Sequence, residues 1–76
     1  MNPLQVARLT VSDRAHRGIY EDQGGPEIER VFSREWNSPC VWLPLILPDD
    51  KEKISEALRL WIGMRIPLIL TTGGTG

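Results

Sequence analysis

The sequence predicts an α/β fold built around a parallel sheet, and three observations lead to this prediction. Apolar segments of strand length alternate with segments of helical periodicity, in the order strand, helix, strand, helix, strand. Two helical crossovers between consecutive strands imply parallel pairing, with each crossover right-handed. The second strand segment contains Pro44, which donates no ladder hydrogen bond and so places that strand at a sheet edge. We expect the strand order 2-1-3, which is 3-1-2 when viewed from the other end.

The composition is that of an ordinary globular protein and disfavours several functional classes. Hydrophobic residues make up 41% of the chain and charged residues 25%, which argues against disorder. The formal net charge is -1 and neither sign forms a run, so nucleic acid is not an expected partner. The lone Cys40 cannot form a disulfide within the chain, and the longest apolar run, Val41–Pro48, is far too short for a membrane span. We expect a cytoplasmic protein with no membrane partner.

The first predicted strand is Gln5–Ser12, which is rich in β-branched and aliphatic residues. Ala7, Leu9 and Val11 share one face of this strand because side chains alternate between faces. Arg8 falls on the opposite face, where an unpaired guanidinium would be costly in a covered sheet. We therefore expect Arg8 to lie near a sheet end or to be paired.

The polar segment Asp13–Gly25 is predicted to be a loop. Pro26 suits the first position of a helix, and this first helix is expected to run to about Asn37. Apolar residues recur on it at helical spacing and predict a face that packs on the core, with Trp36 buried there. That face consists of Ile28, Val31, Phe32 and Trp36.

The second strand is predicted at Cys40–Leu47, an almost wholly apolar run typical of a strand covered on both faces. After it, Asp49 and Glu52 have the spacing of a helix N-cap and its reciprocal partner. The second helix is expected to extend to Gly63, a suitable residue for a helix end. Its apolar face consists of Ile54, Ala57, Leu58 and Trp61, and we expect Trp61 to be buried.

The third strand is predicted at Pro67–Thr72 and runs directly into the glycine-rich segment Gly73–Gly76. A glycine-rich turn after a buried parallel strand normally leads into a helix that covers the sheet. We therefore expect residues 1–76 to be the N-terminal portion of a single longer domain, truncated after the glycine-rich loop.

Candidate site residues gather at the carboxyl ends of the predicted strands, where parallel sheets bind ligands at the point of reversed strand order. The turn after the third strand can turn backbone N–H groups towards a phosphate, with threonine hydroxyls as further donors. The candidates for phosphate binding are Ser12, Asp13, Thr72, Gly73, Gly74, Thr75 and Gly76. Asp49 follows the second strand on the same rim, where a carboxylate could hold Mg²⁺ or position a nucleophile.

Each candidate also has a purely structural interpretation. The glycine-rich segment matches neither a Walker A loop nor a dinucleotide-binding fingerprint, and can be a tight turn without a ligand. Asp49 can be a helix cap and nothing more. His16 is the single histidine and is predicted to be solvated, and no metal cluster can be assembled around it or around Cys40.

Taken together, three segments give the chain a resemblance to the Mog-type family of molybdenum cofactor biosynthesis proteins, the molybdopterin adenylyltransferases. The resemblance extends over essentially the whole chain. It rests on residues 10–15 (TVSDRA) followed by Gly18, Tyr20, Asp22, Gly25 and Pro26, on residues 47–50 (LPDD), and on residues 70–76 (LTTGGTG).

This resemblance implies a three-layer α/β/α domain with strand order beginning 2-1-3, and a homotrimer. It also implies that the terminal phosphate of molybdopterin attacks the α-phosphorus of Mg-ATP, which gives adenylyl-molybdopterin and pyrophosphate. In that reaction Gly73–Gly76 would hold the molybdopterin phosphate, Ser12 and Asp13 would line the pocket, and Asp49 would be catalytic. No residue is assigned to the metal. A second functional aspartate of the family lies beyond residue 76, so we expect the 76 residues alone to be inactive.

Two other functions are compatible with these residues. The chain could be a non-catalytic molybdopterin-binding or trimer-scaffold domain of the same fold. The same crevice could also bind a different nucleotide or a flavin, as it does in other sheets of order 2-1-3. The residues around Ser12 and Asp13 favour the adenylyltransferase.

Overall fold

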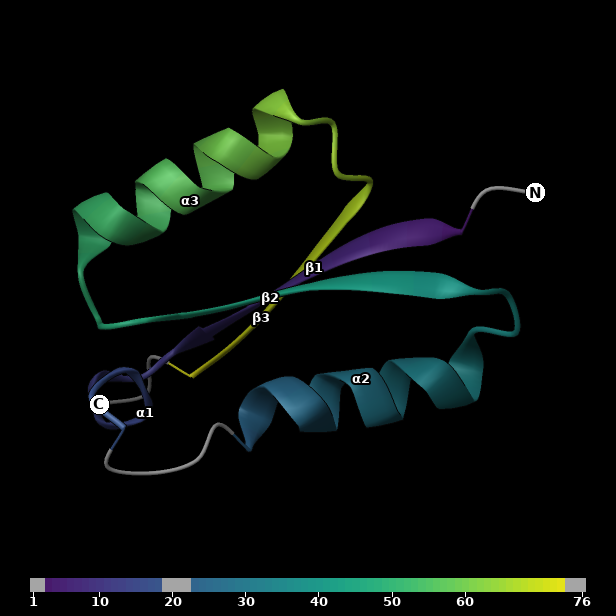
Figure 1. Cartoon of the computed structure of the whole chain (residues 1–76), viewed down its shortest axis with the longest axis horizontal. Coiled ribbons are helices and arrows are strands. Elements are labelled where there is room, and N and C mark those ends of the chain that lie inside the picture. The colour runs from purple at the N-terminus through teal and green to yellow at the C-terminus, as the bar shows by residue number, and fades with distance from the viewer. Residues whose placement is uncertain (1–2, 19–22, 74–76) are drawn as a thin grey trace.

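The computed structural model describes residues 3–18 and 23–73, which form three strands and three helices (Figure 1). The strands are parallel and their order is β2-β1-β3, which confirms the predicted topology. In chain order the elements are β1 (Leu4–Val11), α1 (Asp13–His16), α2 (Gly24–Glu35), β2 (Cys40–Leu47), α3 (Lys51–Gly63) and β3 (Leu68–Gly73). Within the described residues, no helix is long and apolar enough to cross a membrane.

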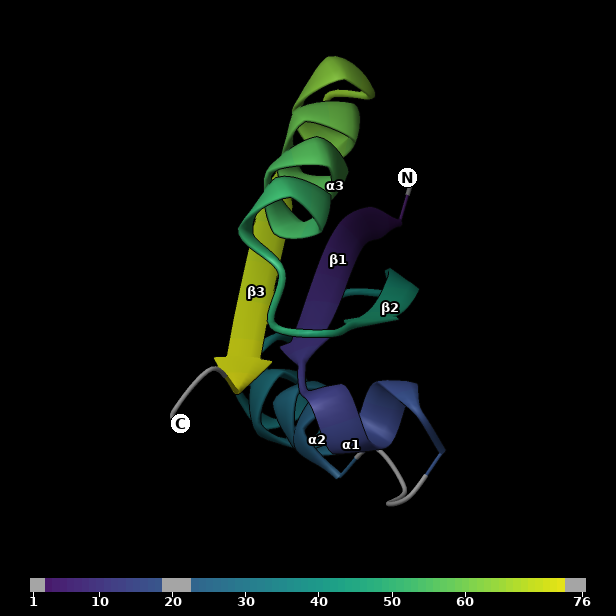
Figure 2. The same ribbon diagram turned by 90° about the vertical axis from the view of Figure 1, so that its left-hand side faces the viewer.

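The longer helices lie on opposite faces of the sheet, α3 on one side and α2 on the other, so that the molecule has three layers (Figures 1 and 2). The best-buried cluster lies beneath α3, where Ala7 and Leu9 of β1 contact Trp61 and Ile66. Ala7 and Leu9 are inaccessible to solvent, and Trp61 is buried as its helical spacing predicts. The alternation of side chains along β1 thus supplies the apolar face on which α3 packs.

The other face of β1 carries Arg8, which forms an ion pair with Glu29 of α2. The predicted pairing of Arg8 is therefore confirmed, in the middle of the strand rather than at its end. Arg8 is opposite Pro44 of β2 and Leu70 of β3. Because its side chain is only 13% exposed, the carboxylate of Glu29 offsets much of the cost of removing the guanidinium from water.

Two sequence expectations about the segment after β1 are wrong. Residues 13–16 form a single helical turn, α1, because the Ser12 side chain accepts a hydrogen bond from the Ala15 N–H at 3.2 Å. The next helix, α2, begins at Gly24 and not at Pro26. Pro26 is tolerated at the third helical position because the first four N–H groups of a helix have no partner within it.

The expectation that Trp36 is buried is also wrong, since 41% of its surface is exposed. The helix ends at Glu35, and Trp36 has an extended backbone with φ of -116°. The ring of Trp36 stacks on Phe32 at a centroid distance of 5.8 Å, and Phe32 meets Trp42 edge to face. Trp36 thus covers the edge of an aromatic cluster instead of entering the core.

The N-terminus of α3 is capped by Asp50 and not, as predicted, by Asp49. The Asp50 carboxylate accepts hydrogen bonds from the N–H groups of Glu52 and Lys53 at 3.0 and 3.2 Å. At the other end, Gly63 is the last helical residue, and Arg65 adopts the left-handed backbone with φ of 59°. The Ile66 N–H reaches back to the Trp61 carbonyl at 3.0 Å, which closes the helix with a Schellman-type turn.

Candidate functional site

The carboxyl ends of β1 and β2 are joined by two hydrogen bonds that bring the first two candidate segments together. The backbone N–H of Ser12 donates to the carbonyl of Leu47 at 2.9 Å, which continues the β1–β2 ladder by one residue. The backbone N–H of Asp49 donates to the Oδ1 atom of Asp13, also at 2.9 Å. Ser12, Asp13 and Asp49 therefore share one rim of the sheet, as the parallel topology predicts.

Ser12 retains a hydrogen that it can donate to a ligand. Its Oγ atom already accepts from the Ala15 N–H, and this bond orients the side chain at the start of α1. A hydroxyl can accept and donate at the same time, so the O–H remains available to a phosphate oxygen. Ser12 is half-buried, which restricts the directions in which that hydrogen can point.

Asp49 lies in an exposed turn between β2 and α3. Because the neighbouring Asp50 caps the helix, the structural interpretation of Asp49 as a cap is wrong. The Asp49 carboxylate makes no hydrogen bond or ion pair with any residue that the structure describes. A carboxylate in this position is free to bind a cation or a polar ligand group from solvent.

Of the third candidate segment, Thr72 and Gly73 are described, and Gly74, Thr75 and Gly76 lie outside the described residues. Thr72 pairs with Thr10 at the end of β3, and Gly73 pairs with Val11. Gly73 has a φ of 94° and lies against the backbone of Val11. This close packing explains one glycine of the segment in structural terms. The pairing of Gly73 with Val11 brings the end of β3 to the same rim as the end of β1 (Figure 2).

The remaining polar candidates do not form a metal site within the described residues. His16 is exposed on α1, as expected for a solvated histidine. Cys40 is half-buried at the start of β2 and its thiol contacts the carbonyl of Ser38 at 3.7 Å. No group of three or more His, Cys, Asp or Glu side chains among these residues could hold a metal ion by itself.

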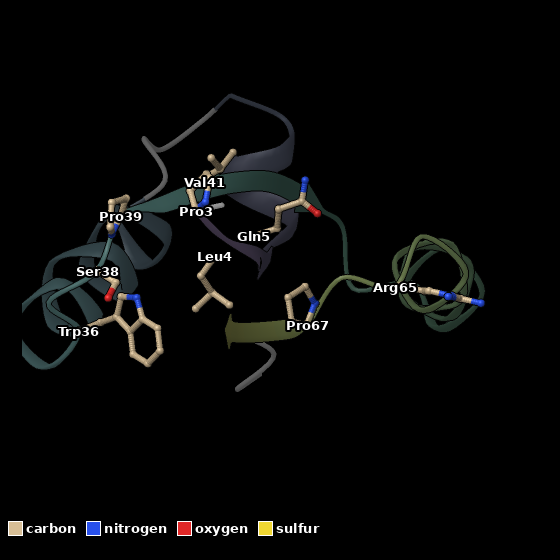
Figure 3. A pocket seen from close by; sticks show the side chains of 9 residues that line it. All are labelled: Pro3, Leu4, Gln5, Trp36, Ser38, Pro39, Val41, Arg65 and Pro67. Carbon is tan, nitrogen blue, oxygen red and sulfur yellow. The ribbon is translucent and has the colours of Figure 1, made fainter. Parts of the chain in front are cut away.

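A hollow of about 620 Å³ lies at the opposite end of the sheet, where the strands begin (Figure 3). Arg65 is the charged residue at its margin, and its side chain points away from the other lining residues. The lining contains no carboxylate that could take part in phosphate chemistry. It consists of Pro3, Leu4, Gln5, Trp36, Ser38, Pro39, Val41, Arg65 and Pro67.

A second, more open groove of about 480 Å³ runs between α2 and β3. Its floor is apolar, and Glu27 lies at its margin. A side-chain hydrogen bond from Arg30 lowers the pKa of Glu27 from its ordinary value, and raises that of Arg30. Glu27 is thus held as an anion, engaged by Arg30 on the surface of α2.

The contact between Asp13 and Asp49 is the feature of the site that sequence reasoning missed. The two residues are 36 positions apart, and each is preceded by a strand whose register had to be known first. The sequence feature that could have indicated the contact is that each aspartate comes two residues after the end of a strand. Sequence reasoning also assigned the helix cap to Asp49 because either of two adjacent aspartates satisfies the capping pattern.

Parallel strands in the order β2-β1-β3, helices on both faces and polar turns at the carboxyl ends define an α/β protein of the class that commonly binds ligands at that rim. No model of a known protein family matches the chain. The chain is 36% identical to molybdopterin adenylyltransferase from Escherichia coli (strain K12) over 77 aligned positions, which cover 100% of the chain and 40% of that protein. It is 38% identical to molybdenum cofactor biosynthesis protein B from Staphylococcus epidermidis, with 97% of the chain and 42% of that protein covered.

Among solved structures, the tungsten cofactor synthesizing protein MoaB from Pyrococcus furiosus superposes with a TM-score of 0.75. The two sequences are 34% identical, and the match covers 100% of this chain and 46% of the other. The chain is thus homologous over its whole length to the molybdopterin adenylyltransferase and MoaB proteins, which confirms the resemblance drawn from its three motifs. It spans about two fifths of the length of the curated relatives it matches.

Proposed function

We propose that the protein takes part in molybdenum cofactor biosynthesis as a molybdopterin adenylyltransferase, and that residues 1–76 supply one wall of its active site. The observation that carries this proposal is the hydrogen-bonded pair of turns at the carboxyl ends of β1 and β2, which leaves the Asp49 carboxylate unengaged by described residues. The alignment of the whole chain with relatives named molybdopterin adenylyltransferase also supports the proposal.

In the proposed reaction, an oxygen of the molybdopterin terminal phosphate attacks the α-phosphorus of ATP. The bond from that phosphorus to the bridging oxygen breaks, and pyrophosphate leaves with the electron pair. The attacking phosphate is already an anion, so the protein has to position the reactants and neutralise charge rather than remove a proton. The Ser12 hydroxyl and the segment Thr72–Gly76 would hold the molybdopterin phosphate.

Mg²⁺ would enter with ATP and neutralise charge on the triphosphate. The donor chemistry of the rim fits this ion, because the exposed Asp49 carboxylate is a hard oxygen ligand of the kind Mg²⁺ takes. Asp49 is the proposed catalytic residue: it would orient the metal-bound triphosphate relative to the attacking phosphate. The working protein would be a cytoplasmic homotrimer.

A chimeric enzyme tests this function. Residues 1–76 replace the matching segment of the Escherichia coli relative, and adenylyl transfer from α-labelled ATP to molybdopterin is measured. We expect the chimera to be active, its Asp49→Asn variant to lose at least about 10²-fold in kcat, and the 76-residue chain alone to be inactive. A chimera that melts cooperatively and binds molybdopterin but transfers no adenylyl group would favour the non-catalytic binding or scaffold function. Tight binding of flavin mononucleotide would favour the remaining alternative, a crevice that binds a flavin or a different nucleotide.

A further inference from the structure

We propose that Asp13 is a positioning residue for Asp49 and not a phosphate ligand: its carboxylate sets the backbone of the turn that carries the catalytic carboxylate. The consequence for catalysis rests on the proposed function above, but the contact itself does not. The inference begins with the 2.9 Å hydrogen bond from the Asp49 N–H to Asp13 Oδ1.

Asp13 is well suited to hold another segment because its own backbone is fixed on both sides. On the strand side, the Ser12 N–H extends the β1–β2 ladder to Leu47. On the helix side, the Asp13 carbonyl accepts from the Arg17 N–H at 3.0 Å, which closes the first turn of α1. The carboxylate therefore presents a stationary acceptor to the neighbouring turn, and a hydrogen bond to a charged acceptor is stronger than one between neutral groups.

The turn that receives this bond is constrained at each of its other positions. Its first residue, Leu47, is bonded to Ser12, and its last, Asp50, donates its N–H to the Pro48 carbonyl at 2.8 Å. The Asp50 side chain is occupied by the cap of α3. The peptide N–H of Asp49 is the remaining point at which the turn could rotate, and Asp13 holds that point. The Asp49 carboxylate, which no described residue engages, then stays available to a ligand.

Electrostatics favours a positioning role for the Asp13 carboxylate and a ligand-binding role for the Asp49 carboxylate. A carboxylate aimed at a phosphate would repel it, whereas one that accepts a backbone N–H places its charge on a peptide dipole. Since a displacement of about 1 Å at a reacting group can cost about 10²-fold in rate, a fixed turn is worth more to the proposed reaction than a second anion facing the substrate.

Amide hydrogen exchange of the 76-residue chain, followed by nuclear magnetic resonance, tests the contact without any ligand. In the wild type the Asp49 amide should be protected. Asp13→Ala should speed its exchange by at least about tenfold, in line with the loss of a hydrogen bond to a charged group. Asp13→Asn keeps an Oδ1 acceptor and should retain part of the protection. In both variants the amides of Val6 and Leu9 in β1 serve as controls and should not change.

Two results would overturn the positioning role. One is an unprotected Asp49 amide in a wild-type chain whose Val6 and Leu9 amides are protected, a result that needs no variant. The other is an Asp13→Ala chain with protected β1 amides and an unchanged rate at Asp49.

The kinetic arm uses the chimera. Asp13→Ala should lower kcat by about 10²-fold with little change in the KM for ATP, and Asp13→Asn should restore part of kcat. A rise in KM for molybdopterin at constant kcat would instead identify Asp13 as a substrate ligand and contradict the proposal. If the wild-type chimera is inactive, the proposed function fails, and the exchange experiment still decides whether Asp13 holds Asp49.

Discussion

Gly73 lies so close to Val11 that a Cβ atom on Gly73 would stand 2.1 Å from the Val11 carbonyl oxygen. The φ of 94° at Gly73 also belongs to a region that residues with side chains rarely adopt. Both features arise where β3 leaves its pairing with β1, at the rim that carries the candidate site. Glycine at this position is therefore required by packing, independently of any ligand.

Replacing Gly73 by alanine should destabilise the fold severely. The positive φ contributes about 1–2 kcal/mol and the clash with the Val11 backbone about 1–3 kcal/mol, because a backbone atom cannot rotate away. The free energy of urea unfolding measures the loss. Gly63→Ala is the matched control: a Cβ there meets nothing within 4 Å, and an alanine in a helix should stabilise α3 by about 0.5–1 kcal/mol. Equal stability of Gly73→Ala and the wild type would show that β3 ends differently.

Gly24 of α2 lies close to Thr72 of β3, and the clash that a side chain on Gly24 would cause can be relieved by a change at Thr72. A Cβ on Gly24 would stand 2.7 Å from Cγ2 of Thr72, which is a side-chain methyl. Gly24→Ala should therefore cost about 1–3 kcal/mol. Thr72→Ser removes that methyl, keeps the hydroxyl, and should recover part of the loss in the double variant. A double-mutant cycle that gives simple additivity would contradict the contact.

The two adjacent aspartates before α3 should respond differently to substitution. Asp50→Ala removes the cap and should cost about 1 kcal/mol, while Asp50→Ser should retain most of the stability. Asp49→Ala should change the unfolding free energy by less than about 0.5 kcal/mol, since its side chain has no partner among the described residues. Thermal or urea unfolding of the three variants distinguishes the residues. The reverse order of effects would restore Asp49 as the cap.

Removing one partner of the Arg8–Glu29 pair should lower the unfolding free energy more than replacing both partners together. Glu29→Ala leaves a guanidinium that is largely buried, so we expect a loss of about 2–4 kcal/mol, somewhat reduced by the partial exposure of Glu29. Arg8→Met together with Glu29→Gln should cost less than Glu29→Ala alone, because neither charge of the Arg8–Glu29 pair is then left without the other. Unfolding free energies of the singles and the double supply the test, and an equally unstable double variant would argue against an ion pair.

The Glu27–Arg30 pair should give α2 a small pH-dependent stabilisation. Hydrogen bonding to Arg30 lowers the pKa of Glu27 from 4.5, so the unfolded state binds a proton more readily than the folded state. The contribution is present above pH 4.5 and is lost as the pH falls through the lowered pKa. Glu27→Gln should thus reduce the melting temperature slightly at pH 7, and should reduce it less at about pH 3, below the ordinary pKa of 4.5. Glu56→Gln on α3 is the exposed control, and an equal effect at both pH values would exclude the pair as the cause.

Sequence patterns were sufficient to predict the three strands, the two long helices and the order of the strands in the sheet. These features follow from periodicity and from single residues with strong backbone preferences, as Pro44 at the edge strand illustrates. The sequence also limited Arg8 to a sheet end or a paired position, because an unpaired guanidinium in a covered sheet is costly, and the structure shows the pairing with Glu29. Local physics is sufficient where one residue or one short pattern excludes all but one arrangement.

The helix cap, the position of Trp36 and the contact between Asp13 and Asp49 depend on the assembled fold, because local energies differ little between the alternatives at these positions. Asp49 and Asp50 both satisfy the capping pattern, and the direction in which β2 delivers the chain to α3 selects Asp50. Trp36 continues the helical spacing but lies beyond the last turn, where the backbone is already extended. The contact of Asp13 with Asp49 depends on the register of two strands, so it exists only once the sheet has assembled.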